Sequence, residues 1–181
     1  MRIIIVGMKG CGKTTLGTLL AEKLQIPFID SDASIEKMHE QERGEAIPFR
    51  EIFKKYGEQY FSALDSKTLK QIAKEFGNTD FVFACGGRTP LQVENQEILS
   101  GLGKVIFLKV EKAVLLKRIL VQGIPAFFPY PADPDKSLDE LLTERLPAYQ
   151  KLADLTIDVS EGTSDEVVNT ILTELRAYGK N

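Results

Sequence analysis

The chain has 181 residues, of which 43% are hydrophobic and 27% are charged, and its formal net charge is −3. This length can bury one substantial core but not two, and the acidic balance argues against the basic face that nucleic acids or anionic membranes require. Two isolated cysteines exclude a disulfide framework and a zinc-ligand cluster. We therefore expect one cytoplasmic domain over residues 1–181, with no signal peptide or membrane helix, in which local positive charge binds any anionic ligand.

Short apolar runs alternate with amphipathic stretches along the chain. The runs are mostly continuous in hydrophobicity, as parallel strands buried on both faces are, and they predict strands at residues 2–6, 28–29, 81–84, 104–110 and 156–159. Helical periodicity predicts helices at residues 13–24, 91–99, 111–121 and 164–177. This alternation predicts an α/β fold with a parallel sheet.

Two stretches interrupt the alternation. Residues 33–76 are charged and helical in pattern, with breaks around Gly44, Pro48 and Gly57. Residues 123–134 contain four prolines and three aromatic residues, too many prolines to continue a helix. We interpret the first stretch, about residues 33–62, as a helical substrate-binding region and the second, about 122–137, as a lid.

Residues 7–14 read Gly-Met-Lys-Gly-Cys-Gly-Lys-Thr and match the phosphate-binding pattern G-x-x-x-x-G-K-[ST] between a predicted strand and helix. The glycines let backbone N–H groups approach phosphate oxygens, and the helix N-terminus adds a favourable dipole. We expect Lys13 to reach the β- and γ-phosphates of ATP and the Thr14 hydroxyl to bind Mg²⁺. A turn without a ligand would explain the glycines but not Lys13 and Thr14 together. The predicted nucleotide contacts are Gly10, Cys11, Gly12, Lys13, Thr14 and Thr15.

Two aspartates, Asp30 and Asp32, follow the second predicted strand. They stand at its carboxyl end, where ligands bind in open α/β sheets. Phosphoryl transfer to an alcohol needs one carboxylate to organise magnesium and another to accept the hydroxyl proton, and this pair could divide those roles. The alternative is a helix N-cap, since Asp and Ser favour that position.

From these residues onward, the motif order resembles the shikimate kinase family over nearly the whole chain. The matching motifs are Gly7 to Thr14, Asp30-Ser31-Asp32 with Ile35-Glu36, Ile52-Phe53, Gly57-Glu58 with Phe61, Cys85-Gly86-Gly87, and Glu144 to Tyr149 with Ala153-Asp154. The resemblance implies a three-layer P-loop NTPase fold of the nucleoside monophosphate kinase type, with a five-stranded parallel sheet in the order 2-3-1-4-5. It implies a kinase that uses ATP and Mg²⁺ to phosphorylate a hydroxyl of shikimate or a similar small hydroxy acid.

The resemblance also implies roles for single residues. Asp30 is the acid associated with magnesium, together with Thr14. Asp32 holds and deprotonates the acceptor hydroxyl, Arg145 binds the acceptor carboxylate, and Arg118 lies near the adenine or the phosphates. The catalytic residues would be Lys13, Asp32 and Arg145, and the substrate-binding residues Asp32, Gly86, Gly87, Arg88 and Arg145.

The chain departs from the family pattern in its cations. Ser62 occupies the place of an arginine that helps bind the carboxylate, Arg88 replaces a third glycine, and Ile124 stands where the lid carries an arginine. The spacing between Gly44 and residues 52–53 is two residues longer, which indicates a local insertion. Arg88 either points into the acceptor pocket in partial replacement or lies on the surface.

These departures leave two rival functions open. One is a kinase of the same fold that acts on another small metabolite, such as a sugar acid or a nucleotide. The other is a regulatory module that binds nucleotide without transferring phosphate. In each case we expect a monomer that binds small anions, not nucleic acid or membranes. We also expect His39 to be solvated and the aromatic residues of the lid to pack within it.

Overall fold

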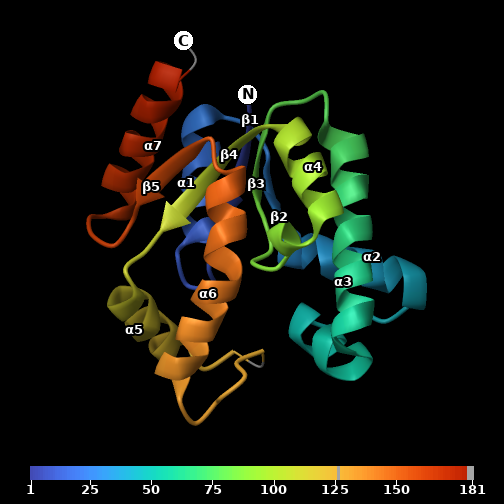
Figure 1. Ribbon diagram of the computed structural model, residues 1–181. Coiled ribbons are helices and arrows are strands. Elements are labelled where there is room, and N and C mark those ends of the chain that lie inside the picture. Colours follow the sequence, from blue (N-terminus) through green and yellow to red (C-terminus); the bar gives the residue numbers. More distant parts are fainter. Residues whose placement is uncertain (126, 179–181) are drawn as a thin grey trace.

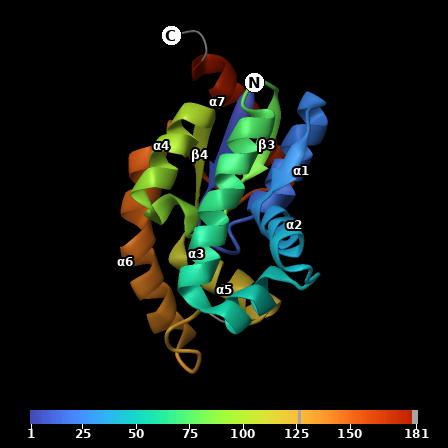
Figure 2. The same ribbon diagram turned by 90° about the vertical axis from the view of Figure 1, so that its right-hand side faces the viewer.

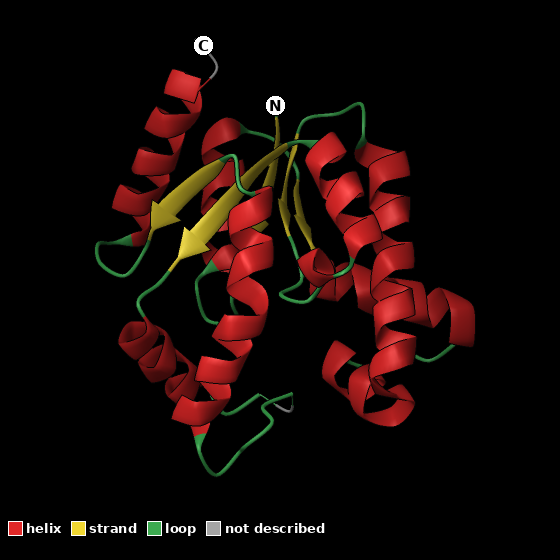
Figure 3. Ribbon diagram, viewed as in Figure 1, coloured by secondary structure: helices red, strands yellow, loops and turns green. Residues whose placement is uncertain are grey.

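Five parallel strands form one sheet at the centre of the protein (Figure 1, Figure 3). The computed structural model describes residues 1–125 and 127–178. In spatial order the strands are β2 (Phe28–Asp30), β3 (Phe81–Ala84), β1 (Arg2–Val6), β4 (Lys104–Lys109) and β5 (Leu155–Asp158). Every neighbouring pair is parallel. The predicted strands and the order 2-3-1-4-5 are confirmed, and the strand ends differ from the prediction by at most one residue.

Helices cover both faces of the sheet and produce three layers. One face carries α1 (Lys13–Leu24) and α7 (Ser164–Tyr178), which pack against each other. The other face carries α4 (Val93–Leu102), α6 (Pro134–Leu152) and the second half of α3 (Phe49–Phe76), and Figure 2 shows α1 and α4 on opposite sides of the strands. None of the helices in the described residues is long and apolar enough to cross a membrane.

The remaining elements extend past the carboxyl ends of the strands. In Figure 1, α2 (Ser31–Arg43) and the start of α3 lie on one side of this end, and α5 (Lys112–Gln122) lies on the other. A short 3₁₀ turn, η1 (Thr89–Leu91), follows β3. Both the predicted substrate-binding region and the predicted lid segment therefore flank the carboxyl end of the sheet, where ligands bind in parallel α/β folds.

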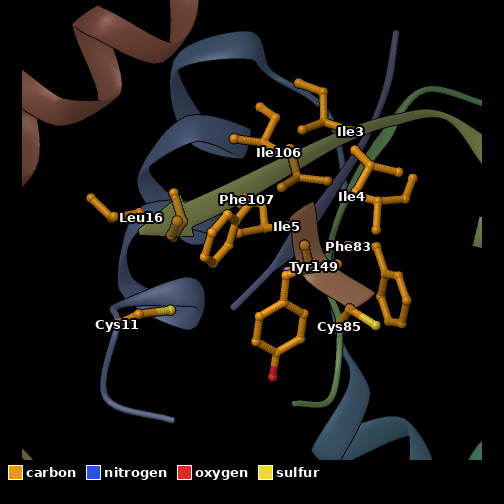
Figure 4. Close-up of a cluster of buried hydrophobic side chains, with 14 of the residues drawn as sticks. Ile3, Ile4, Ile5, Cys11, Leu16, Phe83, Cys85, Ile106, Phe107 and Tyr149 are labelled. Carbon is orange, nitrogen blue, oxygen red and sulfur yellow. The ribbon is translucent and has the colours of Figure 1, made fainter. Parts of the chain in front are cut away.

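The strand β1 is the centre of the core. Its residues 3–6 have no exposed surface, because helices cover both faces, and this explains a continuous apolar run in place of an alternating one. Figure 4 shows these isoleucines among Leu16 of α1, Phe83 of β3 and Phe107 of β4. Each fully buried isoleucine contributes about 1.5–3 kcal/mol. This packing fixes the point at which the chain leaves β1 and enters the phosphate loop.

A second, smaller core joins α2 to α3. Ile35, Ile52 and Leu64 are buried in it, with aromatic side chains packed around them. The helices break where the sequence predicted, since α2 ends at Gly44 with φ 71° and α3 begins after Pro48. Within α3, Gly57 has φ 78° and ψ 176°, a conformation that favours glycine and kinks the helix.

The prediction that His39 is solvated is wrong. Its side chain is completely buried, and its Nδ1 lies 2.9 Å from the hydroxyl of Tyr60. His39 stands four residues after the buried Ile35, so both side chains lie on the face of α2 that packs against α3. The polar composition of this segment concealed that helical periodicity.

The helix α6 was not predicted from the sequence. Pro134 occupies its first turn, where a missing N–H costs no hydrogen bond, and Asp133 caps it by accepting a hydrogen bond from the N–H of Lys136 at 3.1 Å. Pro147 lies inside the helix, and prolines at both points obscured the pattern. One face of α6 is nevertheless buried at spacings of three and four, by Leu138, Leu141, Arg145, Tyr149 and Leu152.

We predict opposite effects on stability for two alanine substitutions near the end of α4. At Gly103, a Cβ atom would lie 2.5 Å from the backbone oxygen of Arg2, so Gly103→Ala should lower the free energy of unfolding by about 1–3 kcal/mol. At Gly101, in the last turn of the helix, a Cβ atom would meet nothing within 4 Å, so Gly101→Ala should raise it by about 0.5–1 kcal/mol. Urea unfolding followed by circular dichroism measures both, and equal midpoints would contradict the close packing of Gly103 on β1.

Candidate active site

The phosphate loop follows β1 and leads directly into α1. Gly7, Gly10 and Gly12 have φ values of 148°, 85° and 98°, which L side chains rarely adopt. A Cβ atom on Gly7 would also lie 2.9 Å from both the Cys11 sulfur and the Leu108 backbone oxygen. Gly12 is the N-cap of α1 and offers no side chain to the first N–H groups of the helix. Those N–H groups are therefore available to an anion, as the motif predicted.

Lys13 and Thr14 begin α1 and point in different directions. The Lys13 ammonium donates hydrogen bonds to the backbone oxygens of Gly7 at 2.9 Å and Met8 at 3.0 Å, so it lies over the loop. The Thr14 hydroxyl donates to Oδ2 of Asp30 at 3.0 Å. The structure thus brings the phosphate loop and the acidic pair together, as the sequence predicted.

Asp30 has two structural roles. Its Oδ1 accepts hydrogen bonds from the backbone N–H groups of Asp32 at 2.9 Å and Ala33 at 3.3 Å, which makes it the N-cap of α2. Its Oδ2 faces Thr14. The capping alternative raised from the sequence is therefore correct for Asp30 without excluding a role at the phosphate loop.

The pocket offers oxygen ligands that suit a magnesium ion bound mainly by phosphates. The Thr14 hydroxyl and Asp30 carboxylate adjoin each other at the loop. Within the part of the chain that the structure describes, no group of three or more His, Cys, Asp or Glu side chains forms a metal cage. Magnesium often takes one or two protein ligands and completes its shell with substrate phosphates and water, so this pair fits it.

Asp32 lies in the first turn of α2 and lines the same pocket. Burial, followed by the negative charge of Asp30, raises the pKa of Asp32 to about 6, although Lys13 and Lys9 oppose the shift. A carboxylate with a pKa near neutrality is a better proton acceptor than an exposed one. This environment suits the role of general base expected for Asp32.

The pocket has a volume of about 350 Å³ and lies between the phosphate loop, β2, β3 and α6. Gly86 and Gly87 form part of its floor, and a Cβ atom on Gly87 would lie 3.5 Å from Nη1 of Arg145. Aromatic side chains line the remaining wall, from Phe49, Phe53, Phe61 and Phe127. A small molecule with an apolar ring face and a charged group matches this lining.

Arg145 is the most unusual polar side chain in the pocket. It is 1% exposed, and its Nη2 has no hydrogen-bond partner among the described residues. Its guanidinium carbon lies 5.1 Å from the centre of the Phe127 ring, and its Nε is 3.4 Å from a carboxylate oxygen of Glu144. A buried guanidinium with a free N–H that lines a pocket needs an anion or a water to satisfy it. The surroundings of Arg145 thus suit a residue that binds an anion.

Tyr149, one turn after Arg145 on α6, contacts the loop that carries Gly86 and Gly87. Its hydroxyl donates to the backbone oxygen of Gly87 at 2.5 Å, and its side chain is fully buried. The hydrogen bond joins α6 to the loop after β3. The spacing between Arg145 and the two pocket glycines is therefore fixed by the fold.

Two other predicted arginines have different surroundings. Arg88 lines the pocket, but its guanidinium forms an ion pair with the exposed carboxylate of Glu58. Each of the two alternatives considered for Arg88, the pocket and the surface, is therefore correct in part. Arg118 donates to the backbone oxygen of Val159 at 3.0 Å, and its Cβ lies 3.9 Å from the position a Cβ on Gly10 would take. It therefore lies behind the phosphate loop and outside the residues that line the pocket. Thr15 lines the pocket, whereas the Cys11 side chain is buried in the core.

The pocket contains charged residues that the sequence analysis did not single out. Lys9, Arg50 and Asp65 all line it. Arg50 lies within the longer spacing between Gly44 and residues 52–53, and that spacing was the signal available in the sequence. Ser62 lies outside the pocket lining, and its backbone oxygen accepts a hydrogen bond from Gln92 at 3.4 Å.

Comparisons with known proteins identify one family. The sequence profile of the family described as shikimate kinase matches residues 9–176. The shikimate kinase of Caldanaerobacter subterraneus subsp. tengcongensis is 36% identical over 178 residues, which cover 98% of this chain and 96% of the relative. That of Thermobifida fusca is 36% identical over 177 residues, covering 97% and 95%. The solved structure of shikimate kinase from Acinetobacter baumannii in complex with shikimate has a TM-score of 0.85 and 30% identity, covering 98% of this chain and 93% of that one.

Asp65 generates a prediction about stability and pH. Burial, aided by the charge of Asp32, raises its pKa from 3.8 to about 6, while the Thr89 hydroxyl, which donates to it at 2.9 Å, and Arg88 oppose the shift. Because the pKa is higher in the folded state, the folded protein binds the extra proton. The stabilisation from this group is therefore complete below the unfolded-state pKa and is lost as the pH rises through the folded-state value.

Asp65→Asn should remove this pH dependence. The free energy of unfolding of the variant, minus that of the wild type, should rise between about pH 4 and pH 7 by on the order of 1–3 kcal/mol. Urea titrations at several pH values measure this difference. Glu97→Gln, which removes an exposed carboxylate from α4, is the matched control for loss of one negative charge. If the difference in free energy of unfolding between Asp65→Asn and the wild type does not change with pH, the pKa of the Asp65 carboxylate is not raised in the folded protein.

Proposed function

The chain belongs to the shikimate kinase family and is an ATP-dependent kinase that phosphorylates a hydroxyl group, and from this premise we propose that its acceptor is shikimate. One observation carries the proposal most strongly. The phosphate loop, the two aspartates and the unsatisfied guanidinium of Arg145 all border one pocket. A small hydroxy acid could place its hydroxyl at one end of that pocket and its carboxylate at the other.

The donor half of the pocket would hold the phosphates of ATP. The free N–H groups at the start of α1 and the Lys13 ammonium supply positive charge there. Lys13 donates hydrogen bonds to two backbone oxygens and would exchange them for phosphate oxygens. Thr14 and Asp30 would hold Mg²⁺, which neutralises charge on the phosphates when bound.

The acceptor half of the pocket would hold shikimate. Arg145 would bind its carboxylate, since a guanidinium donates two parallel hydrogen bonds to such a group. Gly86 and Gly87 allow the backbone to approach the ring, and Phe61 and Phe53 cover apolar surface. This placement directs a ring hydroxyl toward Asp32.

The chemical step then needs one proton transfer and one displacement. Asp32 accepts the proton of the hydroxyl as the oxygen attacks the γ-phosphorus, a P–O bond forms, and the bond between the γ-phosphorus and the β,γ-bridging oxygen breaks. The electron pair of that bond leaves with ADP. Most of the rate acceleration comes from positioning and from positive charge around the phosphoryl group.

We also infer that one chain in the cytoplasm is sufficient for activity. The residues assigned to the donor and acceptor sites already meet in one pocket of this chain, and segment 122–137 adjoins the pocket through Pro125 and Phe127. That segment would act as a lid on a single domain, 1–181, and exclude water when substrates bind.

A kinase of another small hydroxy acid is the second candidate. The observation that favours it is a serine at position 62, outside the pocket lining, so that this part of α3 offers no guanidinium beside Arg145. A single arginine binds a carboxylate less selectively than two.

The first test is a panel of acceptors. ADP release in the presence of Mg²⁺ and ATP should depend on shikimate and remain at background with gluconate or a nucleoside monophosphate. Turnover with only one of the other acceptors would establish the second candidate. Tight ATP binding without turnover on any acceptor would instead indicate a regulatory nucleotide-binding module.

Two substitutions test the proposed roles separately. Asp32→Asn should lower kcat by about 10²- to 10⁴-fold with little change in ATP affinity, because only proton transfer is lost. Arg145→Lys keeps the charge but loses the paired hydrogen bonds, so KM for shikimate should rise by at least about 10-fold. Arg176→Lys, an exposed position on α7, is the control. If Arg145→Lys left KM unchanged, Arg145 would not bind the acceptor carboxylate.

A further inference from the structure

The cations of the pocket differ in whether they already have partners. Lys13 donates to two backbone oxygens, Arg88 is paired with Glu58, and Arg145 is stacked on Phe127 beside Glu144. Lys9 and Arg50 also line the pocket. Among the ion pairs formed by the described residues, none includes Lys9 or Arg50, although the guanidinium carbon of Arg50 lies 5.8 Å from the centre of the Phe49 ring.

Lys9 and Arg50 come from different parts of the chain but act on each other. Lys9 belongs to the phosphate loop, and Arg50 stands in the first turn of α3. Burial and then the charge of Arg50 lower the pKa of Lys9, while Asp32 raises it and Lys13 lowers it. Three charged groups that line the pocket, Arg50, Asp32 and Lys13, therefore act on Lys9. Two cations that line one pocket without a carboxylate partner repel each other, and an anion bound between them would relieve this repulsion.

The position of Lys9 indicates which anion this is. In the proposed function, the phosphoryl group leaves the nucleotide held by Lys13 and joins an oxygen held by Asp32. Lys9 belongs to the same loop as Lys13 and lines the same pocket as Asp32, so it is placed to reach an anion that passes between these two residues. Arg145, by contrast, lies on the wall formed by α6 and Gly87, where the acceptor carboxylate would bind.

The segment that could close over this path carries no cation of its own. Residues 119–135 contain neither lysine nor arginine. Lys136, the next basic residue, lies with its ammonium 4.0 Å from the centre of the Tyr130 ring, outside the pocket lining. In Figure 1, the start of α3, which carries Arg50, stands across the end of the molecule from the α5–α6 connection. Besides a bound magnesium ion, the phosphate loop and α3 can therefore supply the positive charge that this segment lacks.

We propose that Lys9 and Arg50 are catalytic residues that contact the phosphoryl group during its transfer and neutralise the charge on its outer oxygens. Lys9 reaches the group from the phosphate loop and Arg50 from the acceptor side. The pair fits a trigonal phosphoryl group better than a carboxylate, since the phosphoryl group has three outer oxygens to share among Lys13, Lys9 and Arg50. This inference rests on the proposed phosphoryl transfer between Lys13 and Asp32.

The test compares Lys9→Met and Arg50→Gln with variants that preserve charge or remove it elsewhere. Each of the two substitutions should lower kcat with shikimate by about 10- to 10³-fold while KM for shikimate changes by less than about threefold, because the contact is made in the transition state. Lys9→Arg should retain most of the activity. Arg176→Gln removes an equal charge from α7, far from the pocket, and should have no effect.

A binding measurement gives a readout that does not depend on turnover. Aluminium fluoride with Mg²⁺ and ADP mimics the phosphoryl group in transit, so it should increase ADP affinity for the wild-type enzyme. This increase should be lost in Lys9→Met and Arg50→Gln, while the affinity for ADP alone stays unchanged. Calorimetry measures both affinities.

Three results would overturn the inference. A rise in KM for shikimate at constant kcat would show that the pair binds the acceptor before reaction, and unchanged kinetics would show that it does neither. If wild-type enzyme does not turn over shikimate, the proposed acceptor is wrong, and the aluminium fluoride measurement then decides the inference alone. An equal increase in ADP affinity in wild type and both variants would refute it.

Discussion

The geometry of the pocket depends on the Asp30 carboxylate, which accepts hydrogen bonds from two different helices through its two oxygens. One carboxylate oxygen caps α2, and the other accepts a hydrogen bond from Thr14 in the first turn of α1. The start of α2 is thereby fixed against the phosphate loop. Asp32 follows two residues later and is held in the partly buried position that raises its pKa to about 6. A helix cap, worth about 1 kcal/mol in an ordinary protein, here also sets the distance between donor and acceptor sites.

The charges of the pocket show how an acidic protein can bind two anions. The net charge of −3 gives no general attraction for phosphates or carboxylates. The pocket instead concentrates backbone N–H groups of α1 with a few lysines and arginines that come from four separate segments. Arg145 is 1% exposed and packs beside the Phe127 ring, so its charge is little screened, and its Nη2 has no hydrogen-bond partner among the described residues.

Much of this arrangement was predictable from the sequence, because the signals are local. The run of residues 2–6, the glycines of the phosphate loop and the two aspartates each follow from a short-range requirement, and the structure brings them together as expected. The strand order came from the family resemblance, since periodicity alone does not fix which strands are neighbours. The errors arose where a polar or proline-rich segment has a buried face. His39 and α6 are both such cases, and Arg145 itself occupies a position of the buried stripe of α6.

The charged residues that line the pocket were harder to predict for a physical reason. Lys9 occupies a variable position of the phosphate loop, and Arg50 lies in a local insertion, so neither belongs to a pattern with a required residue type. Their significance depends on three-dimensional proximity and on the lack of carboxylate partners among the described residues. A phosphoryl group in transfer needs positive charge around it, but the chemistry does not specify which segment must supply it. The chain segment that supplies this positive charge can therefore differ, while the phosphate loop, the two aspartates and Arg145 keep their positions.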